Sequence, residues 1–391
     1  MDRNATSAPV QEIMLDFDRL TGLASTDAHP RRYLWTDAFA VCNYLELFRQ
    51  TDDETYRNLG LRLVDQVHHI LGRHRDDDPR SGWISGLDEE EGERHPTRGG
   101  LRIGKQLNER KPQEPPNERL EWDQDGQYYH YLTKWMHALN CVSRVTGDPT
   151  YTRWAIELAQ TAHTRFTYAP PFGGQKRIYW KMSIDLTYPL FPSMGQHDPL
   201  DGFVTYSELQ AAATRDFGGS SLPGLKLEIA DMAKVCRGIE LATDDPLGIG
   251  GLLFDASRIA QLMIQDGLKN ISLLETVVDS ALLGMEAFAK GETLEYPGEF
   301  RLAFRELGLS IGLSAVEKLM KGIEENPSLF RQKSYLHRRV EDLMEFMPLR
   351  ETIEQFWMVG KNREASTWTL HREINLVMLA TSLAPGVFLM I

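Results

Sequence analysis

Two ten-residue segments of the sequence combine carboxylates and histidine densely enough to do chemistry, and the first also carries a tryptophan and two tyrosines. The first, Glu121 to His130, reads EWDQDGQYYH, and the second, Ser193 to Gly202, reads SMGQHDPLDG. Carboxyl groups serve as general acid, general base or nucleophile, and aromatic faces stack on sugar rings. Both segments therefore indicate chemistry on a hydroxyl-rich substrate.

The candidates for catalysis are the four aspartates and one histidine of these segments: Asp123, Asp125, Asp198, Asp201 and His197. Hydrolysis of a glycosidic bond needs two carboxyl groups, one as the acid and one as the base or nucleophile. We expect one of them from Asp123 or Asp125 and the other from Asp198 or Asp201. Each of these aspartates also has a structural alternative to catalysis. An aspartate before a helix can cap it, and Asp198-Pro199 can form a turn.

Two further clusters lie nearer the C-terminus. Trp368, His371 and Arg372 open an otherwise uncharged apolar stretch, where a histidine and an arginine are costly unless they are paired or placed at a site. Arg301 and Glu306 precede another apolar run. They form a buried ion pair, or the arginine binds an anionic group of a substrate.

The elements that must position these residues are helices, because apolar residues recur at helical spacing along most of the chain and strand-like alternation is scarce. We predict about twelve helices, near residues 10–21, 33–49, 53–72, 127–145, 150–166, 204–214, 225–242, 247–266, 272–290, 300–322, 328–346 and 370–383.

A short motif recurs between pairs of these helices. Thr51–Tyr56 (TDDETY) is repeated as Thr146–Tyr151 (TGDPTY) and, more loosely, as Thr243–Pro246 (TDDP). In each copy an aspartate can cap the second helix, and proline suits the first helical position. The chain is therefore predicted to be a series of helical hairpins with short inner turns.

The links between hairpins are long, at residues 74–126 and 167–203, and long loops on a rigid scaffold are where function concentrates. We expect them to form the mouth of the fold. The predicted substrate-binding residues are those that the mouth loops and the adjoining helix ends carry: Trp35, Asp37, Arg98, Trp122, Tyr128, Tyr129, His130, Trp180, Tyr188, Arg301, Trp368, His371 and Arg372.

These hairpins resemble the six-hairpin, (α/α)6-barrel superfamily, which includes glycoside hydrolases, polysaccharide lyases and N-acylglucosamine 2-epimerase-like enzymes. The resemblance rests on Trp35-Thr36-Asp37 with Thr51–Tyr56, and on Trp122–Asp125 with Thr146–Tyr151. It implies an all-α fold, an (α/α)6 toroid of helical hairpins with long loops on one face, formed by residues 1–391 as a single domain.

Three functions stay open. The first is a glycoside hydrolase that uses paired carboxylates at the mouth. The second is a sugar epimerase or isomerase, in which His130, His197 and His371 exchange a proton beside a carbonyl while Arg98 or Arg372 holds an oxygen. The third is a terpene cyclase-like enzyme or a noncatalytic ligand-binding toroid, since the pair Asp123-Gln124-Asp125 weakly resembles an acidic cyclase motif.

The charge sum of 43 − 56 = −13 argues against nucleic acid or an anionic membrane as the main partner, because both need a basic footprint. A small sugar or oligosaccharide is expected instead, and a homodimer is possible. The N-terminus lacks a signal-peptide pattern, which favours a cytoplasmic protein. The uncharged stretch Ile374 to Ile391 is interpreted as a buried helix and not as a membrane span.

Cys42, Cys141 and Cys236 each lie in an apolar helical run, so we expect buried free thiols rather than a disulfide or metal framework. The sequence has no Gly-Lys-Ser/Thr phosphate loop, no Gly-x-Ser-x-Gly elbow and no His-Glu-x-x-His motif. No cofactor and no metal are expected. The acidic run Asp88–Glu91 is either a solvated loop or a calcium ligand set.

Overall fold

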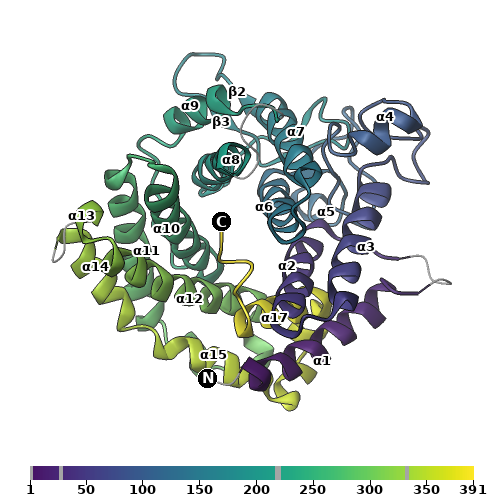
Figure 1. Ribbon diagram of the computed structural model, residues 1–391. Coiled ribbons are helices and arrows are strands. Elements are labelled where there is room, and N and C mark those ends of the chain that lie inside the picture. The colour runs from purple at the N-terminus through teal and green to yellow at the C-terminus, as the bar shows by residue number, and fades with distance from the viewer. Residues whose placement is uncertain (1–2, 26–29, 216–221, 331–333) are drawn as a thin grey trace. The chain divides into compact units, whose positions relative to one another are not determined.

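The structure is a computed structural model that describes residues 3–25, 30–215, 222–330 and 334–391, and the statements below concern these residues. Helices dominate it (Figure 1). The chain falls into two compact units. Unit 1 comprises Met1–Leu20, Arg49–Asp52 and Glu240–Ile391, and unit 2 comprises Thr21–Phe48 and Asp53–Ile239.

Unit 2 carries both segments that the sequence singles out. Its elements are α2 (Leu34–Thr51, whose last residues belong to unit 1), α3 (Glu54–Leu71), α4 (Glu89–Arg94), α5 (Glu118–Glu121), β1 (Gln127–Tyr128), α6 (Tyr129–Thr146), α7 (Pro149–Phe166), β2 (Thr167–Tyr168), β3 (Arg177–Ile178), β4 (Lys181–Met182), β5 (Pro189–Phe191), α8 (Asp198–Arg215) and α9 (Lys226–Val235).

Unit 1 is built almost wholly of helices. Its elements are α1 (Arg3–Thr21, whose last residue belongs to unit 2), α10 (Pro246–Asp266), α11 (Ile271–Lys290), η1 (Thr293–Glu295), η2 (Gly298–Phe300), α12 (Ala303–Glu325), α13 (Pro327–Phe330), α14 (Tyr335–Met344), α15 (Pro348–Met358), η3 (Gly360–Glu364), α16 (Ser366–Thr369) and α17 (Arg372–Leu383).

The recurring motif starts helices as predicted. The side chains of Asp53, Asp148 and Asp245 accept main-chain amides of the first turns of α3, α7 and α10, at 2.9, 2.9 and 3.0 Å. Pro149 and Pro246 occupy the first helical position, where no amide hydrogen is needed. The helical hairpins around the first two copies, α2–α3 and α6–α7, are thereby confirmed.

Several predicted boundaries were wrong. Helix α8 begins at Asp198 and not near residue 204, because Pro199 lies in the first turn, where its ring and missing amide do no harm. Helix α9 ends at Val235 instead of 242, and Gly238 follows it with φ of +72°. The third motif copy therefore does not join two helices by a short turn. The expected helix 328–346, of which 331–333 lie outside the described residues, is replaced by α13 and α14, and α15 was missed.

Short antiparallel strands, which the sequence did not predict, attach the second long link to the start of α6. Strand β1 pairs with β4, with Gln127 opposite Met182 and Tyr128 opposite Lys181, and β5 pairs with the other side of β4. The amide of Tyr129 also donates to the carbonyl of Trp180 at 3.3 Å. This ladder brings the link 167–203 to the amino end of α6.

In unit 1, helices α10 and α12 cross at glycines. A Cβ atom on Gly250 would lie 2.1 Å from the carbonyl oxygen of Gly308, and one on Gly312 would lie 2.6 Å from the Cα of Gly250. Helix α10 has the length and apolar composition of a membrane span, but 78% of its most apolar window is buried, as in the core helix of a soluble fold. Of the uncharged C-terminal stretch, residues 374–383 belong to α17, which is buried from Asn375 to Ser382, and residues 384–391 are not helical.

Arg301 and Glu306 form a buried ion pair in unit 1. Arg301 Nε lies 2.9 Å from Glu306 Oε1 and Nη2 lies 2.7 Å from Oε2, while the indole of Trp357 donates to the same carboxylate at 2.8 Å. The guanidinium also lies 3.7 Å from the ring centre of Phe356. These contacts use the guanidinium of Arg301. Of the two roles predicted for it, a buried ion pair or binding of an anionic substrate group, the structure shows the ion pair.

Breaking this pair is expected to be costly. Arg301→Leu leaves the Glu306 carboxylate buried without its cation, which should lower the free energy of unfolding by about 3 to 5 kcal/mol in urea titrations. The matched control is Arg305→Leu, which breaks the pair to Asp245 at 2.6 Å, whose side chains are 41% and 35% exposed. That change should cost less than about 1 kcal/mol. Equal losses in both variants would contradict the structural role of Arg301.

Candidate functional site

Helices α6 and α8 face each other with polar stripes. On α6 the stripe contains His130, Lys134 and His137, and on α8 it contains Asp198, Asp201 and Glu208, all at spacings of three, four or seven residues. Such spacing places side chains on one helix face. The contacts run in order along both helices: His130 with Asp198, Lys134 with Asp201, and His137 with Glu208. The amino-terminal end of this seam is the candidate site.

Asp198 is the buried carboxyl group at that end. Its carboxyl lies over Gly195, where a Cβ atom would come within 2.4 Å of it, so a larger residue would displace it. Its side chain is 8% exposed, and Oδ2 has no hydrogen-bond partner among the described residues. Burial, together with the negative charge of Asp201, raises the pKa of Asp198 to about 7. Near neutral pH this carboxyl group holds a proton that it can donate.

Asp201, one turn further along α8, has a different environment. Its Oδ2 accepts the ammonium of Lys134 at 2.8 Å and the hydroxyl of Thr133 at 2.5 Å. Two carboxyl groups on one helical turn are thus treated unequally, since one is desolvated and the other is bound by a cation. When two neighbouring carboxyl groups have surroundings that differ in this way, one of them can act as an acid and the other as a base or nucleophile.

His130 stands beside Asp198 at the start of α6. Its Nδ1 lies 3.8 Å from Asp198 Oδ1, too far for a hydrogen bond, and has no partner among the described residues. Burial and the charge of Lys134 lower the pKa of His130 to about 4, which keeps the ring neutral at neutral pH. The indole nitrogen of Trp35, whose ring centre is 5.9 Å from that of His130, is also buried and unpartnered in the described chain.

Unpartnered buried polar atoms are rare in folded proteins, and each calls for an explanation such as a bound ligand or water. Here three of them, Trp35 Nε1, His130 Nδ1 and Asp198 Oδ2, occur on neighbouring side chains. Trp35 Nε1 is a hydrogen-bond donor, His130 Nδ1 can donate or accept, and Asp198 is an acid. Together they suit a hydroxyl-bearing molecule.

Aromatic rings lead from this point to solvent. Trp180 stacks on His130 with ring centres 6.2 Å apart and an angle of 11°, and Tyr128 lies 4.9 Å from Trp180. Trp122, 55% exposed, meets Trp180 edge to face at 5.2 Å. The two segments that the sequence singled out therefore meet through His130 and Asp198, and Trp180, which precedes the second segment in the link 167–203, packs on aromatic residues of the first.

Sequence reasoning missed the partners of Asp201. Thr133 and Lys134 follow His130 by three and four residues, so they lie on the same face of α6. That helical spacing from a histidine already chosen was the signal that could have found them. Tyr131 was also missed, although its ring centre lies 4.9 Å from that of His130.

Asp125 lies in a separate polar network. Its Oδ2 accepts Arg102 at 2.9 Å and Arg75 at 3.2 Å, and its Oδ1 accepts the amide of Gly104 at 2.9 Å. The side chain is fully buried. A carboxylate held by two arginines and a main-chain amide fastens the loop, and a catalytic pairing of Asp125 with an α8 aspartate stays a prediction.

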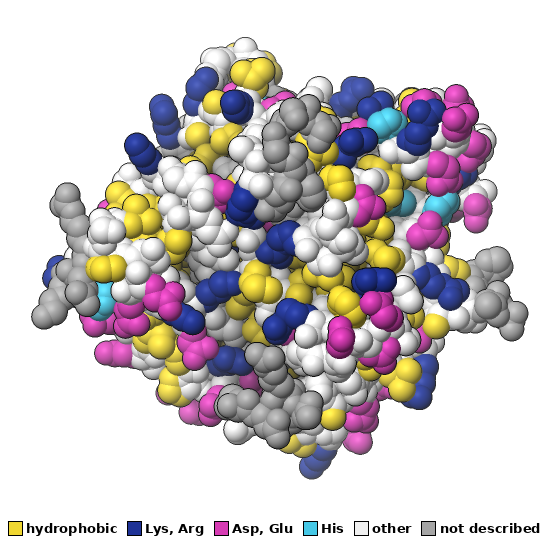
Figure 2. Space-filling model, viewed as in Figure 1, with side chains coloured by type: hydrophobic (Ala, Val, Ile, Leu, Met, Phe, Trp, Pro, Cys, Tyr) yellow, Lys and Arg dark blue, Asp and Glu magenta, His cyan; other side chains and the backbone are white. Residues whose placement is uncertain are grey.

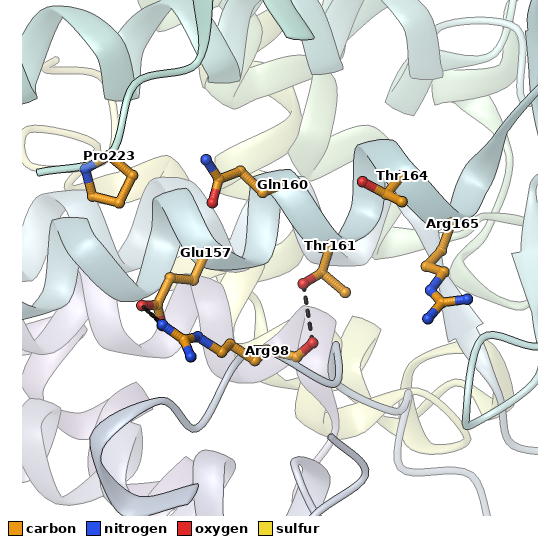
Figure 3. A pocket seen from close by; sticks show the side chains of 7 residues that line it. All are labelled: Arg98, Glu157, Gln160, Thr161, Thr164, Arg165 and Pro223. Atoms are coloured by element: carbon orange, nitrogen blue, oxygen red, sulfur yellow. Dashed lines mark hydrogen bonds and ion pairs between the residues drawn. The ribbon is translucent and has the colours of Figure 1, made fainter. Parts of the chain in front are cut away.

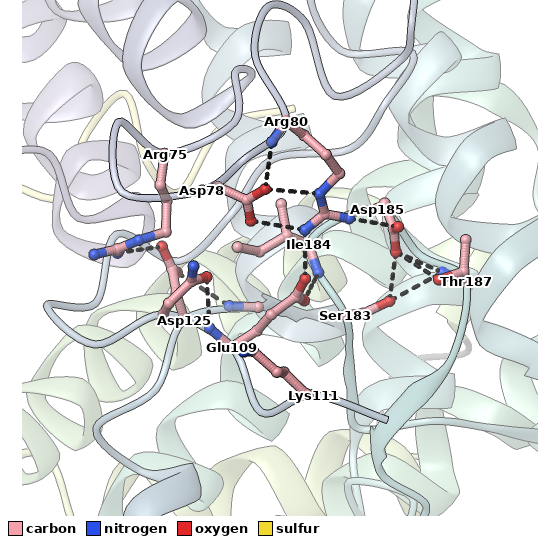
Figure 4. A network of polar contacts seen from close by, with 12 residues as sticks. Arg75, Asp78, Arg80, Glu109, Lys111, Asp125, Ser183, Ile184, Asp185 and Thr187 are labelled. Atoms are coloured by element: carbon pink, nitrogen blue, oxygen red, sulfur yellow. Dashed lines mark hydrogen bonds and ion pairs between the residues drawn. The ribbon is translucent and has the colours of Figure 1, made fainter. Parts of the chain in front are cut away.

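Arg80 joins the two long links in the same region (Figure 4). Its guanidinium contacts Asp78 at 2.9 Å, Glu109 at 2.7 Å and Asp185 at 2.6 Å. Figure 4 shows these carboxylates converging on one cation from three loop segments. The links are therefore cross-braced by charge, which holds β4 and Trp180 against the start of α6.

Other predicted binding residues have structural contacts. Asp37 is buried and accepts from Arg32 at 3.5 Å. Tyr129 is fully buried and donates to the hydroxyl of Tyr206 at 2.9 Å. Tyr188, half-buried, donates to a main-chain carbonyl of the first link at 2.6 Å. These contacts hold the three side chains within the fold, and a role for them in substrate binding stays a prediction.

Asp123 is exposed on the loop before β1, and His197 is half-buried in the turn before α8, where its carbonyl accepts the amide of Asp201 at 3.0 Å. In unit 1, Trp368 is buried and stacks on Trp357, with ring centres 5.5 Å apart. His371 and Arg372 are exposed in the same unit. For Trp368, His371 and Arg372 a role in substrate binding stays a prediction.

Arg98 lies in an open pocket of about 430 Å³ along α7 (Figure 3). Its guanidinium points to Glu157, with Nη2 3.1 Å from Oε1, and Glu157 also contacts His95 at 2.8 Å. The lining residues are Arg98, Glu157, Gln160, Thr161, Thr164, Arg165 and Pro223. This pocket contains neither α8 aspartate, so Arg98 is not brought to the carboxyl pair.

The acidic run begins helix α4 rather than a loop. Asp88 caps the helix by accepting the amide of Glu91 at 2.9 Å. Arg73 pairs with Glu89, and Arg94 with Glu91 at 2.7 Å. Figure 2 shows acidic, basic and histidine side chains crowded together where α3 and α4 lie in Figure 1. Nearby arginines thus pair with this acidic surface.

Comparison with known proteins identifies the fold. No family model matches the sequence, and no curated protein matches it. Among solved structures, the chain is similar to the GH76 alpha-mannanase of Bacteroides thetaiotaomicron, with 8% identity and a TM-score of 0.52 over 100% of this chain and 97% of that one.

Two further solved structures have lower scores. The GH76A alpha-1,6-mannanase of Salegentibacter sp. gives 11% identity and a TM-score of 0.48 over 98% of this chain and 99% of that one. The cellobiose 2-epimerase of Bacillus thermoamylovorans gives 11% and 0.46 over 88% and 87%. The likeness to the Bacteroides protein carries the conclusion: the fold is all-α, an (α/α)6 barrel, as predicted. Identities this low show a fold and not a reaction.

The raised pKa of Asp198 makes a prediction about stability. The native state keeps this proton up to about pH 7, whereas the unfolded chain releases it near pH 4. The stabilising contribution is complete below about pH 4 and is lost as the pH rises through about 7. Asp198→Asn should therefore gain stability relative to wild type across this range, on the order of 4 kcal/mol at the upper end, since one pKa unit is worth about 1.4 kcal/mol.

Urea unfolding at several pH values checks this. Asp123→Asn is the control, because Asp123 is exposed and its replacement should give a difference that is small and independent of pH. A constant difference between Asp198→Asn and wild type at all pH values would show that Asp198 ionises normally.

Proposed function

We propose that the chain is a carbohydrate-active enzyme, a glycoside hydrolase in which Asp198 is the general acid and Asp201 is the base or nucleophile. The observation that carries the proposal is the unequal environment of two carboxyl groups on one turn of α8. Asp198 is desolvated and unpartnered with a pKa near 7, and Asp201 is bound by Lys134. The substrate is a sugar or oligosaccharide seated on Trp180 and Trp122.

The chemistry uses these groups in order. Asp198 transfers its proton to the glycosidic oxygen as the bond from that oxygen to the anomeric carbon breaks. The carboxylate of Asp201 stabilises the developing positive charge and either attacks the anomeric carbon or takes a proton from the attacking water. One water is consumed, and its oxygen and one hydrogen become the new hydroxyl on the anomeric carbon. Its other proton returns to Asp198, directly where Asp201 is the nucleophile and by way of Asp201 and solvent where Asp201 is the base. Lys134 donates to Asp201 and holds it in position throughout.

Substrate binding would use the unpartnered atoms and the aromatic wall, which consists of Trp122, Tyr128 and Trp180. The indole of Trp35 can donate to a sugar hydroxyl, and His130 Nδ1 can donate or accept according to its tautomer. Trp180 and the exposed Trp122 offer flat apolar faces to the rings of a longer substrate. Hydrogen bonds near the reacting centre and stacking further out are a usual division of labour in concave ligand sites.

The leaving group of the substrate separates the two carboxyl groups. Asp198→Asn should lose about 10²- to 10⁴-fold in kcat on glycosides with poor leaving groups and little on dinitrophenyl glycosides, which need no protonation. Asp201→Asn should lose activity on both kinds of substrate. Stopped assays on matched aryl glycosides measure this, with Asp123→Asn as a control that keeps activity. Full activity of Asp201→Asn would exclude the proposed roles.

The pH profile gives a second readout. Wild-type activity on poor leaving groups should fall above about pH 7, as Asp198 loses its proton. In the residual activity that Asp198→Asn retains on the same poor leaving groups, this limb should be absent. A limb that persists in Asp198→Asn would assign it to another group.

A sugar epimerase is the second candidate, and the state of His130 favours it. A neutral, half-buried imidazole whose Nδ1 has no partner among the described residues can remove a proton beside a carbonyl. An epimerase that deprotonates this carbon would exchange the removed proton with solvent, whereas hydrolysis leaves the carbon-bound hydrogens of the sugar in place. Incubation of reducing sugars in D2O, read by NMR, distinguishes the two. Deuterium incorporation that is lost in His130→Gln but kept in Asp198→Asn would replace the hydrolase proposal with the epimerase.

A further inference from the structure

A second cluster lies deeper along the same helices of unit 2. Cys42 of α2 and His137 and Cys141 of α6 are 1%, 0% and 0% exposed. Their sulfur and ring-nitrogen atoms all lie within 4.8 Å of one another, and His137 Nε2 is 3.6 Å from Cys141 Sγ. None of these side chains belongs to the proposed carbohydrate site.

The position of the cluster follows from the helix geometry. Cys42 follows Trp35 by seven residues on α2, and His137 follows His130 by seven on α6. Seven residues are two helical turns, which return to the same face about 10 Å further along the axis. The contact of Trp35 with His130 and the contact of Cys42 with His137 therefore belong to one α2–α6 seam.

The histidine is oriented as a metal ligand is. Its Nδ1 faces the carboxylate of Glu208, 2.9 Å from Oε1, which leaves Nε2 directed to the sulfur atoms. Asn140 donates to the same Glu208 oxygen at 2.8 Å. Histidines that bind metals commonly donate the other ring nitrogen to a carboxylate, which sets the tautomer and the ring orientation.

The donor set selects the kind of ion. Two thiolates and one imidazole are soft or borderline ligands, suited to Zn²⁺ or Cu⁺, whereas Mg²⁺ and Ca²⁺ require oxygen ligands. Two thiolates also neutralise a divalent ion. The guanidinium of Arg144 donates from Nη2 to Cys141 Sγ at 3.2 Å, which favours negative charge on that sulfur.

We propose that Cys42, His137 and Cys141 bind one thiophilic closed-shell cation, Zn²⁺ or Cu⁺, that joins α2 to α6. Each thiol gives up its proton to solvent as the sulfur–metal bond forms. The ion would hold together the two helices whose first turns carry Trp35 and His130. This role does not depend on which reaction the site performs.

Metal titration of the reduced protein tests the proposal. Chelator-treated full-length protein is titrated under anaerobic conditions with Zn²⁺ against a chromophoric chelator, and separately with Cu⁺ against bicinchoninate. We expect one equivalent of one of these ions to bind, and Co²⁺ to give thiolate-to-cobalt charge-transfer absorption. Cys42→Ser and Cys141→Ser should abolish binding. Cys236→Ser is the matched control, because Cys236 lies outside the cluster and should leave binding intact.

Two more measurements keep the test independent of folding in the cysteine variants. Glu208→Gln retains every ligand and should weaken binding by about 10- to 100-fold. The bound ion should raise the melting temperature of wild type and Cys236→Ser only. The proposal is overturned by three free thiols with no stoichiometric binding, by binding that survives in both ligand variants, or by a Cys42–Cys141 disulfide that forms whether or not metal is supplied.

Discussion

The architecture of unit 2 depends on one constraint: helix α6 buries polar side chains along its inner face. A buried polar group without a partner costs free energy, so each of them must be satisfied by a neighbouring helix. Lys134 is satisfied by Asp201 and His137 by Glu208, in the same order along α6 and α8. This matching fixes the register of the two helices far more specifically than apolar packing would.

At the amino-terminal end of the seam the matching is incomplete. His130 and Asp198 come within 3.8 Å without a hydrogen bond, and each keeps an unpartnered buried atom. Farther along, the partners are complete. A seam that is satisfied in the core and unsatisfied at one end is what a binding site built on rigid elements requires, because the rigid part holds the reactive groups in place. The stability given up at Asp198 is offset along the rest of the seam.

The long links act as braces in this structure as well as walls. Asp125 and Arg80, which lie near the aromatic wall, are occupied by opposite charges. Their pairing holds the loops that carry Trp122 and Trp180. Carboxylates that look reactive in the sequence can therefore serve the site indirectly, by keeping the aromatic residues where a ligand would meet them.

The sequence by itself determined what depends on near neighbours in the chain. Apolar periodicity predicted most helices, and the recurring aspartates predicted where α3, α7 and α10 begin, because a cap is made within three residues. The fold class followed from the repeated hairpins. Local signals failed at α8. Pro199 lies in the first turn of this helix, where proline is tolerated, but in the sequence it was interpreted as part of a β-turn before the helix.

Tertiary structure alone decided which of the predicted side chains share a site. The choice of Asp198 with Asp201 over Asp123 and Asp125 depends on burial and on neighbours that are distant in the sequence, and these set whether a carboxyl group is protonated, ion-paired or exposed. Cys42 is about a hundred residues from Cys141, and only the packing of α2 on α6 brings their sulfur atoms together. Spacing along a chain places residues on a helix face, but which face meets which is settled by the packing of the whole unit.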